Sequence, residues 1–104
     1  MAGDDQWRFD AFVASLTDVG EATVVAYRRD VTDFVGWSER GGAGQPQAVD
    51  RALLRRYMAY LTTRRYARRT IARKAASLRR YFGWLRRVGA VDLNPAVRLA
   101  APSG

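Results

Sequence analysis

Apolar residues recur at steps of three and four positions along four stretches of this chain, which is the spacing of an amphipathic α-helix. The helices predicted from this pattern cover residues 7–16, 21–39, 50–63 and 68–88. Asp50 is the predicted N-cap of the third helix, because an aspartate carboxylate can accept a hydrogen bond from a first-turn N–H. No stretch shows the alternation of a β-strand, and no internal repeat is found. The pattern therefore predicts an all-α fold.

The fourth predicted helix carries two separate stripes of side chains. Its apolar stripe, which predicts the seam with the core, consists of Ile71, Ala75, Leu78, Phe82 and Leu85. A second stripe lies about 120° away around the helix axis. This second stripe is made of Thr70, Arg73, Lys74, Ser77 and Tyr81. We expect the first stripe to pack against the other helices and the second to face outward.

Glycine and proline residues mark the ends of the predicted helices. A glycine-rich loop with Pro46 follows the second helix, and Gly89 ends the fourth. Residues 92–95 predict a turn, and the small residues after it are typical of a linker. We therefore expect one domain over residues 1–95, followed over residues 96–104 by the start of a linker to a domain that is absent from this sequence.

Charge is distributed very unevenly along the 104 residues, which carry a net charge of +8. Residues 1–50 contain four arginines and nine acidic residues. Residues 51–104 contain thirteen arginines and one lysine, with Asp92 as the single acidic residue. Such segregation inside one small domain predicts a basic surface, for which a polyanion is the natural partner.

The composition excludes several kinds of site. The sequence has no cysteine and no histidine, so disulfides, thiolate sites and histidine general bases are excluded. Asp30 and Asp33 share one predicted helix but lack further ligands, so we expect no metal site and no cofactor. No apolar run approaches the roughly 18 residues of a membrane span, so we expect no membrane partner.

The outward stripe of the fourth helix is the candidate nucleic-acid interface. Thr70, Arg73, Lys74 and Ser77 occupy positions i, i+3, i+4 and i+7, and a helix with such a row fits the DNA major groove. Arg73 could form a fork with a guanine edge, while Thr70 and Ser77 are short enough to reach phosphates. The arginines expected to meet the DNA backbone at the start of this helix are Arg64, Arg65, Arg68 and Arg69. The alternative is a charged face that only contacts solvent.

Two ordered sets of residues resemble the core-binding domain of tyrosine recombinases and phage integrases. The second predicted helix contains Thr23-x3-Tyr27-x2-Asp30-Val31-x2-Phe34-x2-Trp37. The fourth contains Arg69-Thr70-Ile71-x-Arg73-x3-Ser77-Leu78-Arg79-x2-Phe82-x-Trp84-Leu85, followed by Gly89 and Asn94-Pro95. The resemblance runs over nearly the whole chain, and its arginine-rich character is similar to that of the Xer-type recombinases.

The resemblance implies a SAM-like orthogonal bundle of four helices, or of five in some members, that clamps DNA while a separate C-terminal domain cuts the strand with a tyrosine. It implies groove-facing roles for Thr23 and Ala26 on the second helix. On the fourth helix it implies such roles for Arg69, Thr70, Arg73, Lys74 and Ser77. The sequence lacks the His-x-x-Arg box and terminal tyrosine of the catalytic domain, so we expect no enzyme activity from this chain alone.

The resemblance also implies partners and a location. They are double-stranded DNA and other recombinase protomers, in the bacterial cytoplasm at the nucleoid, with the isolated chain monomeric. The parent protein would be a site-specific recombinase that resolves chromosome dimers or integrates DNA. Two other readings remain open, a stand-alone helical DNA-binding regulator and a basic helical module that binds RNA or acidic proteins.

Overall fold

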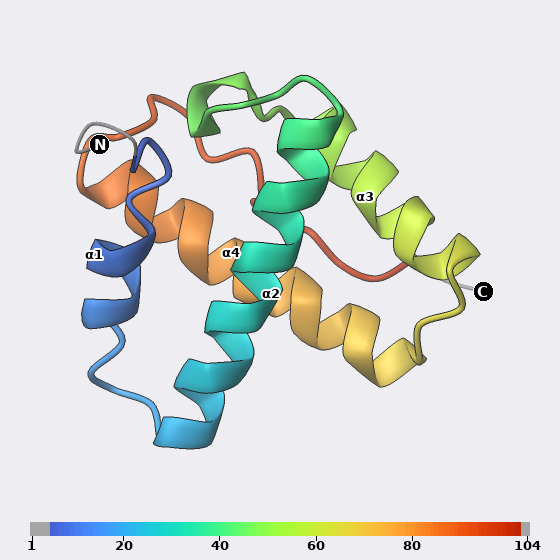
Figure 1. Cartoon of the computed structure of the whole chain (residues 1–104), viewed down its shortest axis with the longest axis horizontal. Helices are drawn as coiled ribbons and strands as arrows, with labels where there is room; N and C mark the ends of the chain where they lie inside the picture. The colour runs from blue at the N-terminus through green and yellow to red at the C-terminus, as the bar shows by residue number, and fades with distance from the viewer. Residues whose placement is uncertain (1–4, 103–104) are drawn as a thin grey trace.

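Four α-helices form in the stretches where apolar residues recur at helical spacing, as the computed structural model shows (Figure 1). They are α1 (Phe9–Ala14), α2 (Glu21–Arg40), α3 (Arg51–Thr63) and α4 (Arg68–Arg87). The structure describes residues 5–102, and this part of the chain contains no β-strand. The all-α prediction and the four predicted helices are confirmed, with the largest differences in bounds at the two ends of the short α1.

The α4 helix lies at the centre of an orthogonal bundle. Figure 1 shows α2 crossing in front of α4, with α1 beside one end of α4 and α3 toward the other. The five residues of the predicted seam, Ile71, Ala75, Leu78, Phe82 and Leu85, are all buried. Their removal from water supplies much of the stabilisation that holds the helices together. The prediction of this core seam is confirmed.

Aromatic rings fill the space around Phe34 of α2. The Phe34 ring contacts Tyr57 at a centroid distance of 5.1 Å and Phe82 at 6.1 Å, both in edge-to-face arrangements. The rings of Trp7 and Trp37 lie 6.3 Å and 6.1 Å from it. Edge-to-face pairs place the positive edge of one ring against the negative face of another, so this geometry adds to the gain from burial alone.

Two helix ends are fixed by local hydrogen bonds that the sequence predicts. Asp50 caps α3, because its Oδ1 atom accepts a hydrogen bond from the backbone N–H of Leu53 at 2.8 Å. Gly89 ends α4 in a left-handed conformation with φ of 80°. The following N–H, of Ala90, donates to the carbonyl oxygen of Leu85 at 2.9 Å. A left-handed residue followed by such a backbone hydrogen bond commonly ends a helix, and glycine is preferred at the left-handed position because it has no side chain.

The segment after α4 differs from the predicted linker. Ala96 and Leu99 are buried in the core, although the sequence predicts that the linker begins at residue 96. The backbone carbonyl oxygens of this segment accept side-chain hydrogen bonds, Val97 from Arg51 at 3.2 Å and Leu99 from Arg79 at 2.5 Å. Figure 1 shows the chain turning back from the end of α4 toward α3, which brings these residues against the bundle. The packed domain therefore extends past residue 95.

Residues 1–4 of the predicted domain and residues 103–104 of the predicted linker lie outside the described residues. Within residues 5–102, no helix combines the length and the apolar character that a membrane crossing requires.

Candidate nucleic-acid interface

A short turn between α3 and α4 gathers four arginines at one end of the molecule. Arg64, Arg65, Arg68 and Arg69 are all exposed. The turn is closed by the N–H of Tyr66, which donates to the carbonyl oxygen of Leu61 at 3.2 Å. The sequence correctly predicts that these arginines lie where α3 ends and α4 begins.

Arg65 occupies the left-handed position that usually belongs to glycine in such a turn. Its φ is 64°, and the same position after α4 is held by Gly89. A side chain in this conformation costs about 1 kcal/mol relative to glycine. The chain therefore carries an arginine at a position where backbone energy favours a residue with no side chain.

The first turn of α4 is unusually positive for a helix start. Arg68 and Arg69 are its first two residues, the turn contains no acidic residue, and Ala67 offers no side-chain cap. The N-terminus of a helix already carries a partial positive charge from its unpaired N–H groups. An anion placed there would be stabilised both by the helix and by the arginines.

The predicted outward stripe of α4 is only partly exposed. Arg73 is exposed and Thr70 is half-buried, but Lys74 is 2% exposed and Ser77 is 0% exposed. The helical wheel predicted that Lys74, Ser77 and Tyr81 would face outward, but all three are buried. The physical reason is that α4 is packed by α2 as well as by α3, so the buried arc of this central helix is wider than its apolar stripe. A part for Lys74 and Ser77 in DNA binding stays a prediction.

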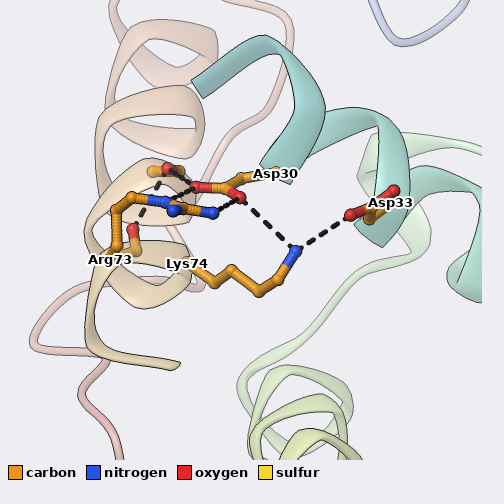
Figure 2. Close-up of polar contacts among 5 residues, drawn as sticks. Asp30, Asp33, Arg73 and Lys74 are labelled. Atoms are coloured by element: carbon orange, nitrogen blue, oxygen red, sulfur yellow. Dashed lines mark hydrogen bonds and ion pairs between the residues drawn. The ribbon is translucent and has the colours of Figure 1, made fainter. Parts of the chain in front are cut away.

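Asp30 of α2 explains why Lys74 and Ser77 can be buried. Its Oδ2 accepts hydrogen bonds from Arg73 Nε at 2.9 Å and Ser77 Oγ at 2.6 Å, and its Oδ1 accepts one from Arg73 Nη2 at 2.6 Å. Lys74 Nζ lies 3.4 Å from Asp30 Oδ1 and 2.9 Å from Asp33 Oδ2. Figure 2 shows these contacts joining α2 and α4. We call these five residues, Asp30, Asp33, Arg73, Lys74 and Ser77, the Asp30 network.

The Asp30 network holds its central carboxylate in the ionised form. Burial of the Asp30 carboxyl raises its pKa, but the hydrogen bonds from Arg73 and Ser77 and the charge of Lys74 outweigh burial and lower the pKa overall. Arg73 shows the reciprocal effect, because its hydrogen bond to Asp30 raises the pKa of the guanidinium. The negative charges of the two aspartates and the positive charges of Arg73 and Lys74 thus neutralise one another, and such pairing allows charged groups to be buried in a protein interior.

Lys74 also connects the network to the arginine-rich turn. Its Nζ atom lies 5.5 Å from the centroid of the Tyr66 ring, a cation–π contact between α4 and the residue that closes the turn. Neither Asp30 nor Tyr66 was singled out from the sequence as a site residue. A signal was present for Asp30, because it falls between Tyr27 and Phe34 on the apolar side of α2, where an unpaired charge would be costly.

The two predicted positions on α2 lie on the same row as Asp30. Ala26 precedes Asp30 by four residues and Thr23 precedes it by seven, so the three share one side of α2. Thr23 and Ala26 are both half-buried, and Asp30 at the end of the row contacts Arg73 of α4. Of this row, Asp30 is the residue that contacts Arg73, while Arg68 and Arg69 lie at the start of α4 and Arg64 at the end of α3.

The acidic residues of the described chain do not gather into a metal-binding cluster. No group of three or more His, Cys, Asp or Glu side chains that could hold a metal ion is found in residues 5–102. The groups present at the start of α4 are exposed arginines and a helix N-terminus without a side-chain cap. Such groups can bind anions through charge-assisted hydrogen bonds.

Comparison with known proteins shows which family and which proteins this chain is similar to. The family model described as phage integrase, N-terminal SAM-like domain, matches residues 8–89. The chain is 31% identical over 94 residues to the tyrosine recombinase XerC of Xylella fastidiosa strain 9a5c, covering 90% of this chain and 32% of that protein. It is 35% identical over 100 residues to the tyrosine recombinase XerC of Pseudomonas fluorescens, covering 93% of this chain and 33% of that protein. No solved structure matches.

Proposed function

This chain belongs to the family of phage integrase N-terminal SAM-like domains, and from that premise we propose that it is the DNA-binding domain of a site-specific tyrosine recombinase. It spans about a third of the length of the curated recombinases that it matches, and it corresponds to their N-terminal domain. The chain is thus one domain of a tyrosine recombinase and not the whole enzyme.

The observation that carries the proposal is the arginine-rich start of α4. Four exposed arginines surround the turn before this helix, and its first turn has no acidic residue. The acids of α2 that face α4 are engaged by Arg73, Lys74 and Ser77, so they do not neutralise the turn. A DNA phosphate backbone is the polyanion that such a surface fits, because each neutralised phosphate releases bound counterions.

The proposed contacts divide into two groups. Arg64, Arg68 and Arg69 hold phosphates at the N-terminal end of α4, and these contacts position the domain on the duplex without reading its sequence. Thr23 and Ala26 of α2 and Thr70 of α4 approach the major groove, which is about 12 Å wide and admits a helix, and Arg73 lies at the edge of this group. Lys74 and Ser77 contribute indirectly, because they help to fix the Asp30 carboxylate beside Arg73.

The family supports a proposal for the role of the whole protein. We propose that the parent recombinase cuts and rejoins DNA through a tyrosine in a separate catalytic domain, while this domain holds the half-site. We propose further that it acts together with other recombinase protomers on duplex DNA in the bacterial cytoplasm, where it resolves chromosome dimers or integrates DNA. In that scheme this domain contributes affinity and geometry to the reaction.

The test is fluorescence anisotropy of the chain with a labelled DNA duplex across a series of salt concentrations. Duplex RNA and an acidic polypeptide serve as competing probes. We expect a steep linear fall of log K with log salt and a preference for duplex DNA. Equal or tighter binding to RNA or to the polypeptide would assign the basic surface to another partner, since duplex RNA hides its major groove from side chains.

A further inference from the structure

The contact between Arg73 and Asp30 uses only one edge of the guanidinium group. Asp30 receives the Nε and Nη2 hydrogens at 2.9 Å and 2.6 Å. An arginine carries five N–H donors in a fixed plane, so the edge formed by Nη1 and the second Nη2 hydrogen takes no part in this contact. The Arg73 side chain is 42% exposed although the carboxylate that holds it is 0% exposed. Arg73 thus lies at the surface, and its guanidinium group is held in place by a buried carboxylate.

The tether limits how far Arg73 can reach. A guanidinium bound to the neighbouring helix lies along the crossing of α2 and α4 and cannot extend its full length into a groove. The phosphate backbone forms the outer rim of the major groove, whereas the base edges lie at its floor. A tethered arginine is therefore suited to a phosphate oxygen, and the sequence-based idea of a fork on guanine is less compatible with this geometry.

We propose that Asp30 is a positioning residue for DNA binding, which holds Arg73 by its inner edge so that the outer edge donates to a DNA phosphate oxygen. This inference rests on the proposed DNA-binding function and adds two statements to it. Arg73 contributes affinity for all sequences, and its contribution depends on a carboxylate that does not itself touch DNA.

The sign of the effect of Asp30→Asn distinguishes positioning from simple electrostatics. The substitution removes a negative charge from a surface that binds a polyanion, so charge alone would make DNA binding tighter. Positioning requires the opposite, because the amide cannot hold the guanidinium by two charge-assisted hydrogen bonds. Asp18→Asn is the matched control, since Asp18 also pairs with an arginine of α4, Arg80, but lies outside the Asp30 network.

The experiment measures binding of the chain to two labelled duplexes of different sequence. The variants are Asp30→Asn, Arg73→Gln, their combination and Asp18→Asn, each checked by circular dichroism melting. We expect Asp30→Asn and Arg73→Gln each to weaken binding about tenfold on both duplexes, which is the size of a lost charged hydrogen bond. We expect no further loss in the double variant, and binding of Asp18→Asn that equals or exceeds that of the parent chain.

Several results would overturn the inference. They are unchanged or tighter binding of Asp30→Asn, additive losses in the double variant, and a loss on only one duplex, which would mean that Arg73 reads bases. If Asp30→Asn fails to fold, Arg73→Lys decides, because it keeps the charge and lacks the rigid second edge. A tenfold loss in Arg73→Lys supports positioning and unchanged binding refutes it. Failure of the parent chain to bind either duplex would instead refute the proposed function.

Discussion

Tyr81, in the middle of α4, donates its hydroxyl hydrogen to the backbone carbonyl oxygen of Trp7, so a residue ahead of the first helix is tied directly to the last. Both residues are buried, and Tyr81 is 0% exposed. The Tyr81 ring also lies 5.1 Å from the ring of Phe12, which anchors α1 on the same side of α4. Trp7 Nε1 also donates to Glu39 Oε2 at 3.1 Å, so the N-terminal part of the domain is attached by both polar and apolar contacts.

Tyr81→Phe should destabilise the domain by about 1–3 kcal/mol, because the buried carbonyl oxygen of Trp7 would lose its hydrogen-bond donor. The ring would remain, so the apolar contacts with Phe12 would be retained. Urea denaturation followed by circular dichroism measures the change. Tyr66→Phe is the control, since Tyr66 is 43% exposed and should change stability by less than about 0.5 kcal/mol. Equal losses in the two variants would contradict the role of the Tyr81 hydroxyl.

Alkaline pH should unfold the domain as its buried tyrosines ionise. Burial raises the pKa of Tyr57 and Tyr81 above the ordinary value of 10.0. Both phenols stay neutral in the folded state, so stability is complete below pH 10.0 and is lost as the pH rises above it, where the unfolded chain ionises first. We expect the tyrosinate absorbance of Tyr57 and Tyr81 to rise over the same pH range in which the helical circular dichroism signal is lost. Ionisation of all five tyrosines without unfolding would refute this expectation.

Acidic pH should act through Asp30. Its pKa in the folded state is lowered below the ordinary 3.8, despite the opposing effect of burial, by the hydrogen bonds from Arg73 and Ser77 and by the charge of Lys74. Stability from this group is therefore present above pH 3.8 and is lost as the pH falls through the lowered pKa. Thermal melts at falling pH should show this loss in the parent chain and a flatter profile in Asp30→Asn. Asp18→Asn should alter the profile less, because Asp18 pairs with Arg80 at the exposed surface.

Leu78→Ala should cost about 2–5 kcal/mol, as expected for a large-to-small change in a packed core. Leu78 is 0% exposed and lies at the centre of the seam that α4 presents to the other helices. Chemical denaturation gives the free energy of unfolding. Leu93→Ala is the matched control, since Leu93 is 81% exposed. A loss below about 0.5 kcal/mol in Leu78→Ala would contradict the assignment of this residue to the core.

Arg69→Ala should weaken binding to every DNA sequence and lower the slope of log K against log salt by about one. The reason is that Arg69 is exposed in the first turn of α4, where we propose that it contacts a phosphate. Arg86→Ala serves as the control, because Arg86 is exposed at the opposite end of the same helix. A loss that depends on sequence, or an equal loss in Arg86→Ala, would contradict the phosphate role.

Most of the fold could be predicted from the sequence because it depends on local patterns. The spacing of Leu78, Phe82 and Leu85 defines a helix and its buried side without knowledge of any other segment. The Asp50 cap and the Gly89 stop are also determined by the residues next to them. The family resemblance was likewise carried by ordered local motifs, and the match to the family model confirms it.

The interior position of Lys74 and Ser77 could not be predicted from their own helix. A helical wheel shows which residues share a side, but the carboxylate that allows their burial comes from Asp30, more than forty residues earlier. The width of the buried arc depends on how many neighbours α4 has, which is a property of the tertiary arrangement. Ala96 and Leu99 were missed for a related reason, since a segment without helical periodicity gives no sign of which residues it will bury.

The segment that follows α4 buries fewer residues than α4 itself. Ala90, Val91, Ala96 and Leu99 are buried, and Gln47, Arg51 and Arg79 donate hydrogen bonds to its backbone carbonyls. Regions with few buried contacts open first under native conditions, while the rest of the fold stays intact. Detachment would release the guanidinium groups of Arg51 and Arg79 from their carbonyl partners. A partly opened domain would therefore have more arginine donors available for an anion than the closed one.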